Sequence, residues 1–163
     1  MQFDNVFLPA NLLWSSPFSR WQGRAADVSS LDLAVQVTRD ALAARQFDAG
    51  TEVRQLVFGG TVPQQNSFYA PPWIAARLGL PEVGGPLVAQ ACATAVACLA
   101  TAAAASALSG GETQLVVTAD RTSNGPLMVY PRSGGMGGSP ATEPWVLASF
   151  AADPWTGNSM LHT

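Results

Sequence analysis

Pro86-Leu87-Val88-Ala89-Gln90-Ala91-Cys92-Ala93-Thr94-Ala95-Val96-Ala97-Cys98-Leu99 is the stretch that decides the fold. Its first half follows Gly84-Gly85 and is short and apolar, which is typical of a buried strand. Its second half continues into an alanine-rich run that ends at Ser109-Gly110-Gly111, as a buried helix would. The stretch therefore predicts a strand followed directly by a helix, with Cys92 at the joint.

The predicted position of Cys92 allows two interpretations. The first-turn N–H groups of a helix have no intrahelical partner, and the helix dipole is positive at that end. A cysteine placed there is stabilised as a thiolate and becomes nucleophilic. The alternative is a small apolar side chain that fills core space, as most buried cysteines do. The local sequence leaves both interpretations open.

Strands and helices are predicted to alternate along the rest of the chain, with short links. Ser29 to Asp32 has the S-x-x-D form of a capping box, and Leu31, Ala34 or Val35, Thr38 and Leu42 are expected to face inward behind it. The predicted elements are a strand at 6–10, a helix from Leu31 to about Arg45, a strand at 53–59, a short helix from about Pro72 to Leu78, the strand and helix around Cys92, and a strand at 113–119. This alternation predicts a parallel sheet covered by helices on both faces.

Length and composition favour one folded domain. The chain has 163 residues, of which 48% are hydrophobic and 12% charged, so it can bury a core and is not disordered. The net charge is −3, which argues against a nucleic-acid partner, because phosphate binding needs clustered basic residues.

Metal and membrane sites are not predicted. Cys92 and Cys98 would lie on different faces of one helix, and with a single histidine they make no zinc site. Met1-Gln2-Phe3-Asp4-Asn5 lacks the basic start of a secretory signal. The run 91–108 is mostly alanine with Thr, Ser and Cys, which favours a buried helix over a membrane span. These features predict a cytoplasmic protein.

The last part of the chain differs in character. Ser133 to Pro140 is glycine-rich, and no strand is expected before it and no helix after it, so we interpret it as a plain loop. Trp145, Phe150 and Trp155 follow, and these apolar residues need a partner surface, so we expect an oligomer.

Several motifs, in this order, resemble the N-terminal half of a thiolase, an acyl-CoA acyltransferase. They are Ser16-Pro17-Phe18 with Trp21-Gln22-Gly23-Arg24-Ala25, then Val53, Val57, Phe58 and Gly59, then Ala76-Arg77-Leu78-Gly79-Leu80-Pro81, then Gln90-Ala91-Cys92-Ala93-Thr94-Ala95, and finally Asp120 to Pro126 with Tyr130-Pro131. The order of these motifs is more specific than any one of them.

The resemblance implies an α/β fold with a mixed, mostly parallel sheet, one half of the αβαβα thiolase fold. Residues 1–131 would form the core half, and residues 132–163 the start of a loop excursion that shapes the coenzyme A site. Cys92 would be the nucleophile that accepts an acyl group. Thr94-Ala95 stands where the family has Ser-Gly, and Gln65 to Tyr69 lacks an arginine expected there; both departures concern substrate preference more than fold.

The predicted function follows from this resemblance. Cys92 would take the acyl group in a Claisen condensation or in the thiolytic cleavage of a 3-oxoacyl-CoA, a step of lipid metabolism, with the coenzyme A thioester as substrate and no further cofactor. Gln90, Asn124 and Arg132 are candidate substrate contacts. Asp120 and Arg121 are expected to form a structural pair, Cys98 to pack, and the lone His162 to lie in solvent.

The resemblance implies that the remaining catalytic groups lie on a C-terminal half or on a partner chain. It also implies an oligomer, either a homo-oligomer or a hetero-oligomer with the chain that carries the C-terminal half. Two alternatives remain: a ketosynthase-like condensing enzyme, and an inactive thiolase remnant that acts as an interaction subunit.

Overall fold

The computed structural model describes residues 3–123, 125–126, 128–131 and 145–148. The chain divides into two compact units, Met1–Asn124 and Gly125–Thr163. The first unit contains η1 (Ala10–Leu12), α1 (Ser30–Ala44), α2 (Ala49–Glu52), β1 (Val53–Gly59), η2 (Ser67–Tyr69), α3 (Ala70–Arg77), β2 (Leu87–Val88), η3 (Ala91–Ala93), α4 (Thr94–Leu108) and β3 (Thr113–Thr118). The second contains β4 (Met128–Pro131) and β5 (Trp145–Ala148). The predicted division at residue 131 stays a prediction.

The first unit is built on a parallel sheet of three strands in the order β2-β1-β3. The central strand β1 pairs with β2 at Phe58 and Leu87, and with β3 from Val53 to Gly59. The predicted α/β class with a parallel sheet is therefore confirmed.

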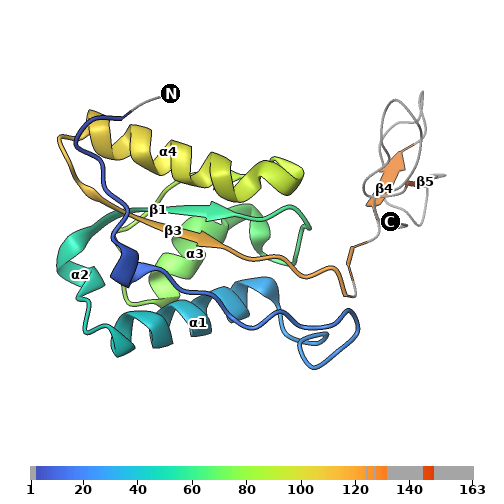
Figure 1. Cartoon of the computed structure of the whole chain (residues 1–163). Helices are drawn as coiled ribbons and strands as arrows, with labels where there is room; N and C mark the ends of the chain where they lie inside the picture. The colour runs from blue at the N-terminus through green and yellow to red at the C-terminus, as the bar shows by residue number, and fades with distance from the viewer. Residues whose placement is uncertain (1–2, 124, 127, 132–144, 149–163) are drawn as a thin grey trace. The chain divides into compact units, whose positions relative to one another are not determined.

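Helices cover both faces of this sheet. Figure 1 shows α4 on one face, and α1 and α3 on the other. Leu31, Val35 and Ile74 of α1 and α3 pack with sheet residues in the main core, while Cys98 and Ala102 of α4 pack with Val57 in a smaller cluster. Hydrophobic burial on two faces explains why β1 is buried over its last four residues instead of alternating.

Helix α1 begins where the sequence predicts. The Ser29 hydroxyl accepts a hydrogen bond from the Leu31 N–H at 3.1 Å, which satisfies one of the unpaired N–H groups of the first turn. All the residues expected to face inward are buried: Leu31, Ala34, Val35, Thr38 and Leu42. Asp32 forms no second half of a capping box in the described bonds; it lies 3.5 Å from the Arg77 guanidinium instead.

The predicted first strand at 6–10 is wrong. Residues 6–9 form no strand, and η1 begins at Ala10. A strand needs a neighbouring strand for its backbone hydrogen bonds. Strand β3 lies at an edge of the sheet, and in the described part of the chain it pairs only with β1.

Helix α4 ends as predicted, but it is not buried. Gly110 has φ +80° after the last turn, and the Gly111 N–H donates to the Ser106 carbonyl at 2.8 Å, which closes the helix. Thr94, Cys98 and Ala102 are its buried residues, while Val96 and Leu108 are 70% and 89% exposed. The three-stranded sheet covers only one side of the helix, and no other described element of the first unit covers the opposite side.

By length and composition alone, the helical span Ala91–Leu108 could cross a membrane, with a mean hydropathy of 1.8 and 17% of the span buried. One such helix is weak evidence, because the core helix of a soluble protein passes the same test.

The second unit contains an antiparallel pair, β4 with β5, in which Met128 is opposite Ala148. The expectation that no strand precedes the glycine-rich segment is wrong, because β4 ends at Pro131, two residues before Ser133. Residues 133–140 themselves lie outside the described residues, as do Phe150 and Trp155.

Candidate active site

Cys92 lies at the carboxyl edge of the parallel sheet. Its turn, η3, follows β2 after two residues and leads directly into α4. The Gly60 N–H donates to the Val88 carbonyl at 3.2 Å, so the end of β1 lies beside the segment that carries Cys92. The side chain of Cys92 is exposed and its thiol is free. A thiol placed this way, at the start of a helix and open to solvent, can meet a ligand at the edge where α/β proteins bind them.

The turn around Cys92 has an unusual backbone. Ala91 has φ +46°, a left-handed conformation that residues other than glycine rarely adopt. The Thr94 hydroxyl accepts a hydrogen bond from the Gln90 N–H and donates one to the Ala91 carbonyl, both at 2.8 Å. Thr94 therefore connects the two residues before Cys92 to the first turn of α4.

The start of α4 is close to β1 at Gly59. A Cβ atom at Gly59 would lie 2.6 Å from the Cys98 sulfur and 2.9 Å from the methyl carbons of Thr94 and Thr118. Only a residue without a side chain allows this approach. Gly59 thus sets the distance between the sheet and the helix that begins beside Cys92.

Cys98 has a packing role, as predicted. It is fully buried at 0% exposure and contacts Val57 and Ala102. Burial raises the pKa of the Cys98 thiol, because the apolar surroundings disfavour its charged form. The two cysteines are both free, and the expectation that they form no bridge is confirmed.

Asp120 and Arg121 have structural roles, but the predicted pairing between them is wrong. The Asp120 carboxylate accepts hydrogen bonds from the N–H groups of Thr61 and Val62, both at 2.8 Å, and from the Thr61 hydroxyl at 2.7 Å. Arg121 instead donates to the carbonyls of Ala26 and Val28, at 2.8 and 3.1 Å. Partners in two different loops, at residues 61–62 and 26–28, therefore take the place of the neighbouring opposite charge.

Of the other predicted site residues, only Gln90 is described. Its side chain is exposed, two residues before Cys92 in the sequence. Asn124, Arg132 and His162 lie outside the described residues.

Sequence reasoning missed the hydrogen bonds of Thr94 and those between Asp120 and Thr61. A hydroxyl residue two positions after a helix-start cysteine is a signal for the first, since Ser and Thr bond main-chain groups at helix starts. Nothing local signals the second, because 59 residues separate its partners.

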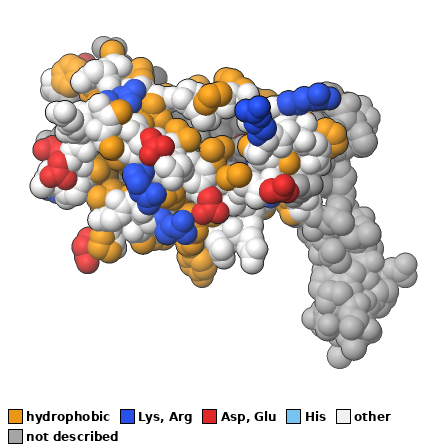
Figure 2. Space-filling model, turned by 90° about the horizontal axis from the view of Figure 1, so that it is seen from below, with side chains coloured by type: hydrophobic (Ala, Val, Ile, Leu, Met, Phe, Trp, Pro, Cys, Tyr) orange, Lys and Arg blue, Asp and Glu red, His pale blue; other side chains and the backbone are white. Residues whose placement is uncertain are grey.

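No group of three or more His, Cys, Asp or Glu residues that would suit a metal ion occurs in the described part of the chain. On the face that carries α1, acidic and basic side chains are interspersed and form no basic patch (Figure 2).

No protein-family model and no curated protein matches this sequence. Solved structures do resemble it, and two acetyl-CoA acetyltransferases are among them. The acetyl-CoA acetyltransferase from Syntrophomonas wolfei matches with a TM-score of 0.63 and 26% identity, over 69% of this chain and 28% of that one. The acetyl-CoA acetyltransferase from Bacillus anthracis matches with a TM-score of 0.61 and 18% identity, over 73% of this chain and 30% of that one.

These matches define the class of protein: the chain has a thiolase-like α/β fold. More particularly, it resembles a thiolase N-terminal fragment, as the order of its motifs predicts. The chain spans less than a third of the length of either acetyltransferase.

Proposed function

We propose that this chain is the acyl-accepting part of a thiolase-type acyltransferase, with Cys92 as nucleophile. The observation that carries the proposal is an exposed thiol in the turn before α4, in a fold that matches an acetyl-CoA acetyltransferase. The substrate class is a coenzyme A thioester, and no further cofactor takes part. A cytoplasmic location belongs to the same proposal.

In the proposed first step, the Cys92 thiolate attacks the carbonyl carbon of an acyl-CoA. The carbon–sulfur bond to coenzyme A breaks, coenzyme A leaves as a thiolate that takes up a proton, and the acyl group remains on Cys92 as a thioester. One thioester replaces another, so the exchange costs little free energy. Gln90, exposed beside Cys92, is the proposed polar contact to substrate within the described residues; Asn124 and Arg132 remain candidates.

The second step needs groups outside this chain. A base must remove a proton from the α-carbon of a second acyl-CoA, and donors must stabilise the enolate oxygen. The enolate carbon then attacks the acyl carbonyl, and the Cys92 thiolate leaves. We assign these groups to polypeptide beyond the 163 residues, in an oligomer that completes the active site.

The first test is an intact-protein mass spectrum after brief exposure to acetyl-CoA. We expect one acetyl group on the chain and none on Cys92→Ser, because serine lacks an acidic thiol at this site. Cys98→Ala is the matched control and should acquire the acetyl group as the unmodified chain does, since Cys98 is buried. An acetyl group that persists on Cys92→Ser, or none on the unmodified chain in its native assembly, would refute the proposal.

A further inference from the structure

Thr94 lies where the sheet, helix α4 and the turn that carries Cys92 meet. It is the first residue of α4 and is only 6% exposed. Thr94, Cys98 and Ala102 are the buried residues of the helix, and their spacing of four places them on one face. Cys92, two residues earlier, is exposed. Thr94 is therefore fixed by packing, whereas the thiol beside it is open to solvent.

The methyl group of Thr94 packs against the end of β1. A Cβ atom at Gly59 would lie 2.9 Å from the Thr94 methyl carbon, so the methyl group occupies space that a side chain at Gly59 would need. A β-branched side chain also has few allowed rotamers in a helix. Because the methyl group lies against Gly59, the direction of the Thr94 hydroxyl is fixed as well, and it points back to the residues before Cys92.

The Thr94 hydroxyl bonds two main-chain groups of this turn at once. It accepts a hydrogen bond from the Gln90 N–H and donates one to the Ala91 carbonyl, both at 2.8 Å. These bonds connect residues 90 and 94 directly, with Cys92 between them. Gln90 and Ala93, which precede η3 and α4, make no side-chain capping bond. Among the described hydrogen bonds, Thr94 therefore provides the side chain that supports the turn.

The backbone conformation that these bonds hold is unfavourable for alanine. Ala91 has φ +46°, in the left-handed region that residues other than glycine rarely adopt. Such a conformation persists only where the surrounding structure enforces it. The two bonded groups, the Gln90 N–H and the Ala91 carbonyl, lie on either side of this dihedral angle. Loss of the hydroxyl would let Ala91 relax, and the following residue, Cys92, would change direction.

We infer that Thr94 is a positioning residue for Cys92: its hydroxyl holds Ala91 in the left-handed conformation and so fixes the direction of the thiol. The inference rests on the proposed function for its effect on acyl transfer, but not for its effect on the thiol itself. Attack on a carbonyl carbon needs a defined distance and direction of the sulfur, so a displaced thiol lowers the rate of the reaction more than the binding of the substrate.

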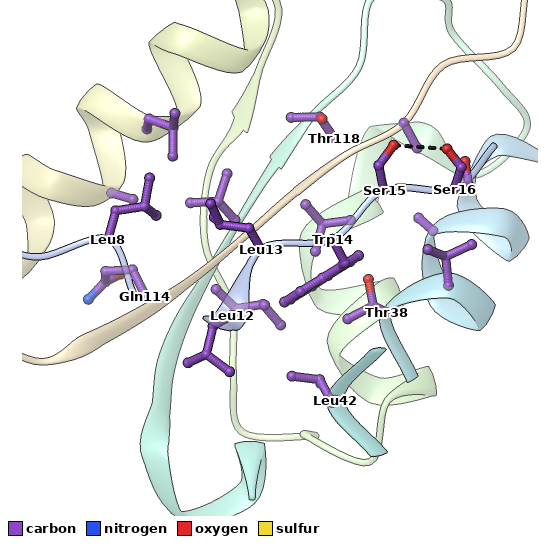
Figure 3. Close-up of a pocket in the computed structure, with 18 of the residues that line it drawn as sticks. Leu8, Leu12, Leu13, Trp14, Ser15, Ser16, Thr38, Leu42, Gln114 and Thr118 are labelled. Carbon is purple, nitrogen blue, oxygen red and sulfur yellow. Dashed lines mark hydrogen bonds between the residues drawn. The ribbon is translucent and has the colours of Figure 1, made fainter. Parts of the chain in front are cut away.

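Two variants separate the hydroxyl of Thr94 from its methyl group. Thr94→Val keeps the branched shape and loses the hydroxyl, whereas Thr94→Ser keeps the hydroxyl and loses the methyl group. Thr118→Val is the matched control, since the Thr118 methyl carbon would lie equally close, at 2.9 Å, to a Cβ at the same glycine. Thr118 lines a cavity of about 1010 Å³ with Trp14 and Ser15 (Figure 3), and none of residues 90–94 belongs to the described lining of that cavity.

The rate at which acetyl-CoA acetylates the full 163-residue chain, followed by intact-protein mass, tests the inference. In Thr94→Val the maximal rate should fall about tenfold or more, while the acetyl-CoA concentration that gives half of this rate stays within about twofold. Thr94→Ser and Thr118→Val should keep the maximal rate within about threefold of the unmodified chain. Equal losses in Thr94→Val and Thr94→Ser, or no loss in Thr94→Val, would overturn the inference.

Alkylation of Cys92 by iodoacetamide separates this inference from the proposed function, because it involves no acyl transfer. It should be about threefold or more slower in Thr94→Val than in Thr94→Ser, since a thiol turned away from the helix start loses the partial positive charge there. If this difference is found but the unmodified chain takes up no acetyl group, the proposed function fails and the inference stands. If the unmodified chain is acetylated but the two variants react alike, the inference fails and the proposed function stands.

A further variant, Ala91→Gly, tests the backbone part of the inference. Glycine adopts a positive φ without the steric cost that alanine has. Thr94→Val should therefore lose less of the acetylation rate when it is combined with Ala91→Gly than when it is made alone, as a double-mutant cycle would measure. An equal fold-loss in the two backgrounds would contradict the role of the Thr94 hydroxyl in holding Ala91.

Discussion

Cys92 and Cys98 are six residues apart in sequence and differ completely in exposure. Cys92 is exposed to solvent. Cys98 is buried where α4 packs on β1, and this burial raises the pKa of its thiol. We expect iodoacetamide to modify Cys92 in the folded chain and Cys98 only after unfolding, since reaction needs access and a thiolate. Peptide mass mapping with and without urea measures this, and equal modification of both thiols in the folded chain would contradict the packing of α4.

Burial of Cys98 also predicts a pH dependence of stability. In the unfolded chain the thiol ionises near pH 8.5, while the folded chain keeps its proton to higher pH. Above the unfolded pKa the unfolded state therefore binds fewer protons, so the free energy of unfolding falls as pH rises. Urea titrations between about pH 8 and pH 10 should show a steeper fall for the unmodified chain than for Cys98→Ala. Parallel pH profiles would show that Cys98 is not the cause.

Gly59 is the residue on which the spacing of β1 and α4 depends. Gly59→Ala should lower the free energy of unfolding by about 1–3 kcal/mol, because its Cβ would meet the Cys98 sulfur and two threonine methyl groups at under 3 Å. Gly84→Ala is the matched control, since a Cβ there meets nothing within 4 Å. Adding Cys98→Ala to Gly59→Ala removes the shortest contact and should recover part of the loss, as a double-mutant cycle would measure.

At the scale of elements, Asp120 connects the end of β3 to the loop after β1. Its carboxylate accepts three hydrogen bonds from Thr61 and Val62. Asp120→Ala should destabilise the chain by about 1–3 kcal/mol and speed amide exchange at these two residues, because their N–H groups lose a charged acceptor. Glu112→Ala, at the opposite end of β3, is the control and should change neither quantity. Unchanged exchange at Thr61 in Asp120→Ala would show that the carboxylate does not hold this loop.

The elements predicted correctly are those with local signals. The cap at Ser29, the apolar spacing from Leu31 to Leu42, and the glycines at 110 and 111 mark α1 and the end of α4, and the structure agrees. Strand β1 has the predicted bounds, Val53–Gly59, because two glycines follow its apolar residues Leu56 to Phe58. The position of Cys92 between a strand and a helix was also predicted, but the strand before it was expected to be buried, and β2 is only two residues long and is not buried.

The predictions that failed depend on distant parts of the chain. Residues 6–9 have the composition of a strand but pair with no other strand in the described part of the chain. Asp120 and Arg121 carry opposite charges, yet each finds main-chain acceptors or donors in loops far away in sequence. The local sequence shows neither whether a segment has a neighbouring strand nor which distant main-chain groups lie near a charged side chain. The prediction that α4 is buried failed for the same reason, because the burial of a helix depends on which elements pack against it.

At the scale of the whole chain, the outer side of α4 is an apolar surface that the sheet leaves uncovered. Val96 and Leu108 are 70% and 89% exposed, and exposed apolar surface of this kind marks a site of association.

The double variant Val96→Gln, Leu108→Gln should therefore reduce self-association of the chain without lowering its free energy of unfolding by more than about 0.5 kcal/mol, because both side chains are exposed in the folded state. Light scattering coupled to size exclusion measures the association, and urea titration measures the stability. Phe68→Gln is the matched control: this side chain is 78% exposed on a different element, η2, so its loss should leave an association through α4 unchanged. If Phe68→Gln reduced association as much as the double variant, the association would be a non-specific contact of exposed apolar side chains. A reduction in the α4 double variant alone would place the interface on that helix.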